Sequence, residues 1–113
     1  MGNLIRDFQT YLEVERNVSA HTKNAYLADL QEFVHFLRKN GLIKNADEAA
    51  EVQVESIRAF LGYLYRQKVK KVTVNRKISS LRAFYKFLMR QGKIKKNPAS
   101  MVQTPKTEKY MPV

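Results

Sequence analysis

The sequence contains no cysteine, only four isolated glycines and no long hydrophobic run. The absence of cysteine excludes disulfide bonds and thiolate metal sites, and isolated glycines cannot form a glycine-rich phosphate loop. No apolar segment approaches the roughly 20 residues that a membrane-spanning helix needs. The N-terminus also lacks a basic segment followed by an apolar core, so no secretory signal is expected. These absences favour a cytoplasmic protein without a membrane partner.

Acidic residues are nearly absent from the second half of the chain. Residues 1–55 hold six Lys or Arg and nine Asp or Glu, whereas residues 56–113 hold fifteen Lys or Arg and one acid, Glu108. The formal net charge of +11 is therefore concentrated in the second half. Such an asymmetry creates a strong positive field on one part of a fold, which is typical of nucleic-acid binding. A basic surface that only aids solubility is the alternative.

Apolar residues recur at helical spacing along the chain, and no stretch shows the alternation of a β-strand. Asn3 is a candidate N-cap for a first helix, and Ser19 is one for a second helix over residues 20–39, which Asn40-Gly41 would end. A third helix is expected over residues 54–67, with Gly62 at a close helix contact and Tyr65 facing inward. Thr73 would cap a fourth helix that ends at Gly92.

Shorter elements complete the predicted fold. Asp47 is expected to cap a short turn, and Asn97-Pro98 reads as the start of a short final helix. The fold class is therefore all-α, a four-helix antiparallel bundle with a short C-terminal helix. Residues 1–103 would form the domain, and residues 104–113, which carry two prolines and no apolar periodicity, would form an extended linker.

The fourth predicted helix has one apolar face and one basic face. No carboxylate lies within it, and we expect Arg76 and Lys86 to remain exposed and unpaired with acidic side chains. A helix fits the major groove, where arginine can bind guanine through two hydrogen bonds. The candidate DNA-binding residues of this helix are Arg76, Lys77, Ser79, Ser80, Arg82 and Lys86.

The opening turn of the second predicted helix is another candidate, because free backbone N–H groups and the helix dipole favour a phosphate there. Its candidate DNA-binding residues are Thr22, Lys23 and Asn24. Contacts to phosphate position a protein on DNA without reading sequence. Further candidates for such contacts are Ser19, His21, Arg90, Lys93 and Lys95.

Other constellations give weaker indications. His21 and His35 are fourteen residues apart, and no cysteine or carboxylate stands near either of them at the spacing of metal ligands. No metal site is therefore expected. Asp29 and Glu32 are interpreted as a solvated acidic surface rather than a catalytic pair. Most aromatic residues recur at helical spacing and are expected to lie in the core. Phe36 and Phe87 lie away from the centre of the apolar face of their helices. No cofactor and no small-molecule substrate are predicted.

Two segments together resemble a known family. SAHTKNAYLADLQEFVHFL over residues 19–37 follows the pattern Ser-x-x-Thr-x-x-x-Tyr-x-x-Asp-Leu-x-x-Phe, and VNRKISSLRAFYKFLMRQG over residues 74–92 is followed by NPA. Both are similar to signatures of the N-terminal core-binding (SAM-like) domain of Xer-type tyrosine recombinases and phage integrases. The resemblance covers about residues 4–105.

The resemblance implies a four-helix bundle that forms half of a C-shaped clamp on double-stranded DNA. The second and fourth helices would approach the major groove, and residues 4–11 would help neighbouring protomers to pack. It also implies that the catalytic residues, including a nucleophilic tyrosine, lie in a C-terminal domain that this sequence lacks. Tyr110 does not match that nucleophile, so this fragment is expected to bind DNA but not to be an enzyme.

Two alternatives remain from the sequence. A helical protein-interaction module could use the basic face to dock an acidic partner, and it would give no gel shift with duplex DNA. Binding to structured RNA is a weaker alternative, because the helices lack exposed aromatic stacking surfaces.

Overall fold

The computed structural model describes residues 3–105, and within this range the chain is helical without a β-strand. The elements are α1 (Leu4–Thr10), η1 (Tyr11–Glu15), α2 (Ala20–Lys39), η2 (Ala46–Glu51), α3 (Val54–Arg66), α4 (Lys71–Arg90) and η3 (Pro98–Met101). η1 is one π-helical turn that continues α1, whereas η2 and η3 are short 3₁₀ helices. The predicted all-α fold is confirmed. The predicted linker lies mostly outside the described residues.

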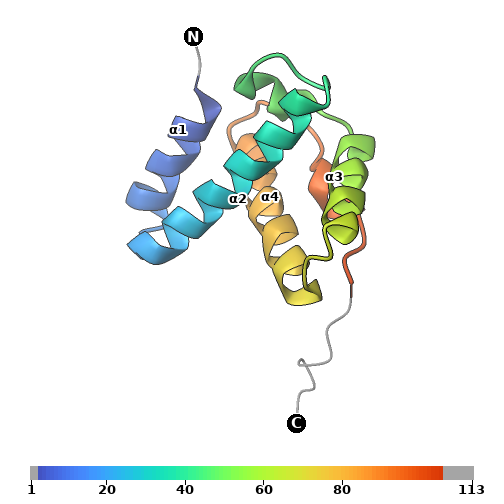
Figure 1. The fold of residues 1–113 in the computed structure, drawn as a ribbon. Helices are drawn as coiled ribbons and strands as arrows, with labels where there is room; N and C mark the ends of the chain where they lie inside the picture. Colours follow the sequence, from blue (N-terminus) through green and yellow to red (C-terminus); the bar gives the residue numbers. More distant parts are fainter. Residues whose placement is uncertain (1–2, 106–113) are drawn as a thin grey trace.

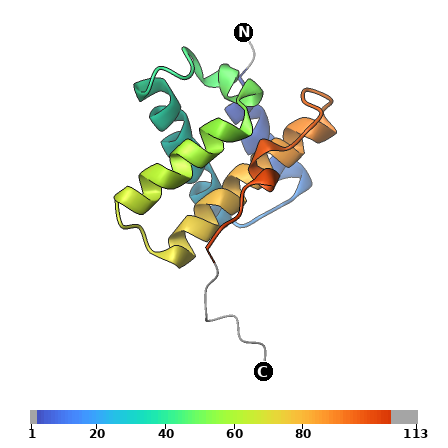
Figure 2. The same ribbon diagram turned by 90° about the vertical axis from the view of Figure 1, so that its right-hand side faces the viewer.

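Helix α4 is the centre of the domain. It crosses α2 and also contacts α3 and η3, as the two views in Figures 1 and 2 show. Eight of its residues are buried, because the helix is covered on several sides. The core around it consists of large apolar side chains, among them Phe8, Leu30, Phe33, Phe60, Leu64, Ile78, Leu81, Phe84 and Leu88.

Three predicted N-caps are confirmed. The side chain of Asn3 accepts a hydrogen bond from the Arg6 N–H, and that of Ser19 accepts one from the Thr22 N–H. Asn97 accepts one from the Ala99 N–H, with Pro98 at the first helical position. Each side chain satisfies an N–H that the helix itself leaves unpaired. At the other end of α2, Gly41 has a φ of +72°, the left-handed conformation that glycine adopts without strain.

Four local predictions are wrong. α4 begins at Lys71 rather than after Thr73, and its N-cap Lys70 makes no side-chain capping bond. η2 is capped by Asn45, whereas Asp47 accepts the N–H of Leu4 at 3.0 Å. Asp47 therefore joins η2 to the start of α1.

The other two concern α3. A Cβ atom added at Gly62 would meet only the Arg66 side chain, at 3.4 Å, so no neighbouring helix approaches there. Tyr65 was expected to face inward, but 48% of it is exposed. The apolar stripe of α3 is therefore narrower than the sequence pattern indicates.

The aromatic residues that lie off the predicted stripes pack between helices. The Phe87 ring of α4 lies 4.8 Å from the Tyr11 ring, and the Phe36 ring of α2 lies 5.3 Å from the Phe60 ring of α3. Leu4, Phe8 and Tyr11 are buried within the same core. The apolar side of α1 is therefore occupied inside this chain.

Candidate nucleic-acid interface

One stripe of α4 faces solvent and carries basic and small polar residues. Arg76, Ser79, Lys86 and Arg90 are exposed along it. From Arg76 to Arg90 the stripe extends about 21 Å at 1.5 Å per residue. Among the described residues, neither Ser79 nor Lys86 has a side-chain hydrogen bond or ion pair. The middle of the stripe is therefore open to a ligand.

The two arginines of the stripe have partners inside the protein. Nη2 of Arg76 lies 2.8 Å from Oδ1 of Asp29 in α2, although 52% of the Arg76 side chain remains exposed. Nη1 of Arg90 donates to the Tyr11 hydroxyl at 3.1 Å, and its guanidinium carbon lies 5.7 Å from the centre of that ring, a cation–π distance. The prediction that Arg76 is unpaired with acidic residues is wrong, but its exposure is confirmed.

Lys77 and Ser80 do not belong to the exposed stripe. Lys77 Nζ lies 3.3 Å from Asp29 Oδ1 and 2.5 Å from Glu32 Oε1, and only 15% of its side chain is exposed. Ser80 is fully buried, and its hydroxyl donates to Asp29 Oδ2 at 2.8 Å. Both were predicted to face a ligand, but α2 covers them. The interpretation of Asp29 and Glu32 as a solvated surface is wrong for Asp29, of which 2% is exposed.

Arg82, also predicted to contact DNA, turns toward the segment that follows α4. Its Nε donates to the carbonyl oxygen of Ala99 and its Nη2 to that of Val102, both at 3.0 Å. The side chain of Asn97 donates to the carbonyl oxygen of Arg82 at 3.1 Å, and that of Asn75 donates to the carbonyl oxygen of Pro105 at 2.9 Å. These bonds hold residues 97–105 against α4.

The first turn of α2 presents polar side chains, as expected. Ser19, His21 and Asn24 are exposed, and Thr22 and Lys23 are half-buried. Besides capping the helix, Ser19 donates its hydroxyl hydrogen to Thr22 Oγ1 at 3.1 Å.

Lys23 has an acidic neighbour in η1. Its Nζ lies 2.6 Å from Glu13 Oε2. The hydrogen bond from Lys23 lowers the pKa of the Glu13 carboxyl, and a second one from Gln9 acts in the same direction. Lys23 therefore carries a charge that is partly neutralised within the protein.

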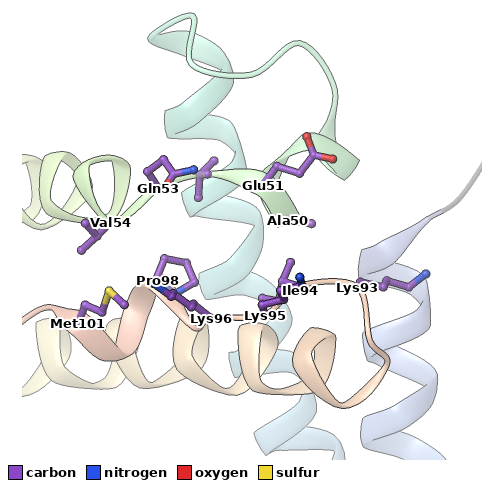
Figure 3. Close-up of a pocket in the computed structure, with 11 residues that line it drawn as sticks. Ala50, Glu51, Gln53, Val54, Lys93, Ile94, Lys95, Lys96, Pro98 and Met101 are labelled. Carbon is purple, nitrogen blue, oxygen red and sulfur yellow. The ribbon is translucent and has the colours of Figure 1, made fainter.

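The basic turn after α4 lines a cleft of about 540 Å³. Lys93, Lys95 and Lys96 lie along one side, and residues 50–54 lie across from them (Figure 3). These lysines are beyond the C-terminal end of α4, whereas Arg76 is near its N-terminal end.

Within residues 3–105, no group of three His, Asp or Glu residues comes together that could hold a metal ion.

Asp29 is the residue of this region whose buried position and contacts with α4 were not predicted from the sequence. It accepts hydrogen bonds from Arg76, Lys77 and Ser80 of α4. A signal was present, because Asp29 follows Tyr26 by three residues and precedes Phe33 by four, so helical periodicity places it on the same face as these two aromatic residues. A carboxylate at such a position needs a polar partner from another element.

Comparisons with known proteins give the family. The family described as "Phage integrase, N-terminal SAM-like domain" matches residues 5–92. Tyrosine recombinase XerC of Syntrophus aciditrophicus is 46% identical over 115 residues, which cover 99% of this chain and 37% of that protein. Tyrosine recombinase XerC of Bacillus subtilis is 41% identical, with 97% of this chain and 35% of that protein covered.

The chain thus spans about a third of the length of the curated relatives that it matches. No solved structure matched it. In the described range, no helix is both long and apolar enough to cross a membrane. Because the family match extends over residues 5–92, the chain belongs to the phage integrase N-terminal SAM-like domain family.

Proposed function

We propose that this chain is the DNA-binding, core-binding domain of a site-specific tyrosine recombinase. The observation that carries the proposal is the exposed stripe of α4, on which Lys86 has no ion pair among the described residues and no carboxylate interrupts the helix. In a domain of this family, such a stripe suits the polyanionic backbone and the major groove of duplex DNA.

Two groups of residues would meet the DNA. On α4, the contacts come from Arg76, Ser79, Lys86 and Arg90. On α2, they come from the first turn: Ser19, His21, Thr22, Lys23 and Asn24. Lys93 and Lys95 would add contacts to phosphate beyond the end of α4. Lys77 and Ser80 are left out of this interface because α2 covers them. Arg82 is left out because its guanidinium binds the carbonyl oxygens of Ala99 and Val102.

The domain would hold a recombination half-site and would not itself cleave DNA. About two thirds of the length of the relatives lies outside the aligned region. We place the catalytic residues of the whole protein there. Such a protein would act in the cytoplasm, where bacterial DNA is found.

A salt titration with duplex DNA tests the proposal. If the domain neutralises Z phosphates, the logarithm of the binding constant should fall with the logarithm of salt concentration at a slope of about −0.9Z. Lys86→Ala should weaken binding and make the slope shallower by about 0.9, with the helical circular dichroism signal unchanged.

Lys44→Ala is the matched control, because Lys44 is exposed in the connection between α2 and η2 and belongs to neither group of proposed DNA contacts. It removes one positive charge as well, but it should change the slope far less. Absence of a gel shift with duplex DNA at modest salt would contradict the proposal and favour a module that docks an acidic protein.

A further inference from the structure

Asp29 joins the two helices that carry the proposed interface. It is buried, and both of its carboxylate oxygens are used: Oδ1 accepts from Arg76 and Lys77, and Oδ2 accepts from Ser80. All three donors belong to α4, whereas Asp29 belongs to α2. A carboxylate shielded from water depends on such partners, so Asp29 favours one relative placement of the two helices.

The contact with Arg76 leaves most of that guanidinium available. Only Nη2 binds Asp29, and neither Nε nor Nη1 has a partner among the described residues. With half of the side chain in solvent, these remaining N–H groups can reach an external acceptor. A guanidinium held at one nitrogen loses less side-chain freedom when it binds a phosphate than a free arginine does.

We infer that Asp29 is a positioning residue for DNA binding, because it holds Arg76 in the direction of a DNA phosphate while it fixes α2 on α4. The inference rests on the proposed function. According to this inference, the buried negative charge of Asp29 strengthens the binding of DNA, although DNA is itself negatively charged.

The positioning role and the net charge predict opposite changes in DNA affinity when Asp29 is neutralised. Asp29→Asn raises the net charge by one, and long-range electrostatics alone would then strengthen DNA binding. If Asp29 positions Arg76, the variant should instead bind duplex DNA about threefold or more weakly. Glu32→Gln is the matched control, since Glu32 lies one turn further along α2 and contacts Lys77 but not Arg76. It should leave the affinity unchanged or raise it.

A double-mutant cycle separates positioning from a general loss of structure. In the native background, Arg76→Ala should weaken binding about fivefold or more. In the Asp29→Asn background, the same substitution should have a clearly smaller effect, because a neutral amide oxygen holds the Arg76 guanidinium less firmly than a carboxylate does. Lys86→Ala should weaken binding by the same factor in both backgrounds, since Lys86 does not contact Asp29.

A second variant covers the case in which Asp29→Asn fails to fold. Ser80→Ala removes one hydrogen bond from Asp29 without changing any charge, and it should lower the affinity by a smaller factor. Tighter binding by Asp29→Asn, an undiminished effect of Arg76→Ala in that background, or unchanged affinity of Ser80→Ala would each overturn the inference. Failure of the native chain to bind DNA would overturn the proposed function instead.

Discussion

The hydroxyl of Tyr85 donates a 2.5 Å hydrogen bond to the carbonyl oxygen of Ala49, which ties the C-terminal half of α4 to η2. The side chain is fully buried, and burial raises the pKa of the phenol, so the hydroxyl stays protonated as a donor at any physiological pH. This bond crosses a part of the core that is otherwise apolar.

Tyr85→Phe should lower the free energy of unfolding by about 1–2 kcal/mol, because it removes the donor and leaves the Ala49 carbonyl without this partner. Urea denaturation followed by circular dichroism measures the change, with the denaturant slope unaltered. Tyr65→Phe is the control, since Tyr65 is largely exposed and should give a change near zero. Equal stabilities of native and Tyr85→Phe protein would show that the bond contributes nothing.

Arg82→Ala should destabilise the segment after α4 rather than act mainly on DNA binding. The substitution leaves the carbonyl oxygens of Ala99 and Val102 without their charged donor, at a cost of about 1–3 kcal/mol. Hydrogen exchange of residues 97–105 should become faster. Arg58→Ala, on the exposed side of α3, removes an equal charge and should leave that exchange rate unchanged.

The ion pair between Glu13 and Lys23 predicts a pH dependence of stability. The folded-state pKa of Glu13 lies below its ordinary value of 4.5, so its contribution is present above that pH and is lost as pH falls through the folded value. Glu13→Gln should therefore melt slightly below the native protein at pH 7, and the difference should vanish in strong acid. A constant difference across the acid range would assign the effect to something other than this titration.

Ser19→Ala should weaken the start of α2. It removes the side-chain bond to the Thr22 N–H, and an N-cap of this kind contributes about 1 kcal/mol. Thermal melting measures the loss, and Ser100→Ala is a suitable control because Ser100 is exposed and forms no side-chain hydrogen bond in the described range. The opposite ranking of the two variants would contradict the capping role.

Much of the fold could be predicted from the sequence because helix starts depend on a few adjacent residues. Asn3, Ser19 and Asn97 cap the helices that they precede, since each cap is decided within three residues. The prediction for Asp47 failed for a long-range reason. Its carboxylate bonds to Leu4, 43 residues away, and no local pattern indicates that contact.

The interface could be predicted only in outline. Periodicity alone places Ser79 and Lys86 on the exposed side of α4. Burial of Ser80 depends on Asp29, 51 residues earlier in the chain, and hence on the way that α2 crosses α4. A face of α4 that one neighbouring helix leaves exposed can be covered by another helix. Only the assembled bundle determines which residues of α4 remain exposed.

Hydrogen bonds hold residues 97–105 against α4. A spectroscopic probe attached to this segment would therefore follow the position of α4. Gln103 is exposed and lies next to Val102, whose carbonyl oxygen Arg82 holds. Since this 113-residue chain contains no cysteine, Gln103→Cys would accept a single maleimide dye. Fluorescence transfer from that dye to an acceptor on a DNA end would then report the orientation of α4 on the duplex.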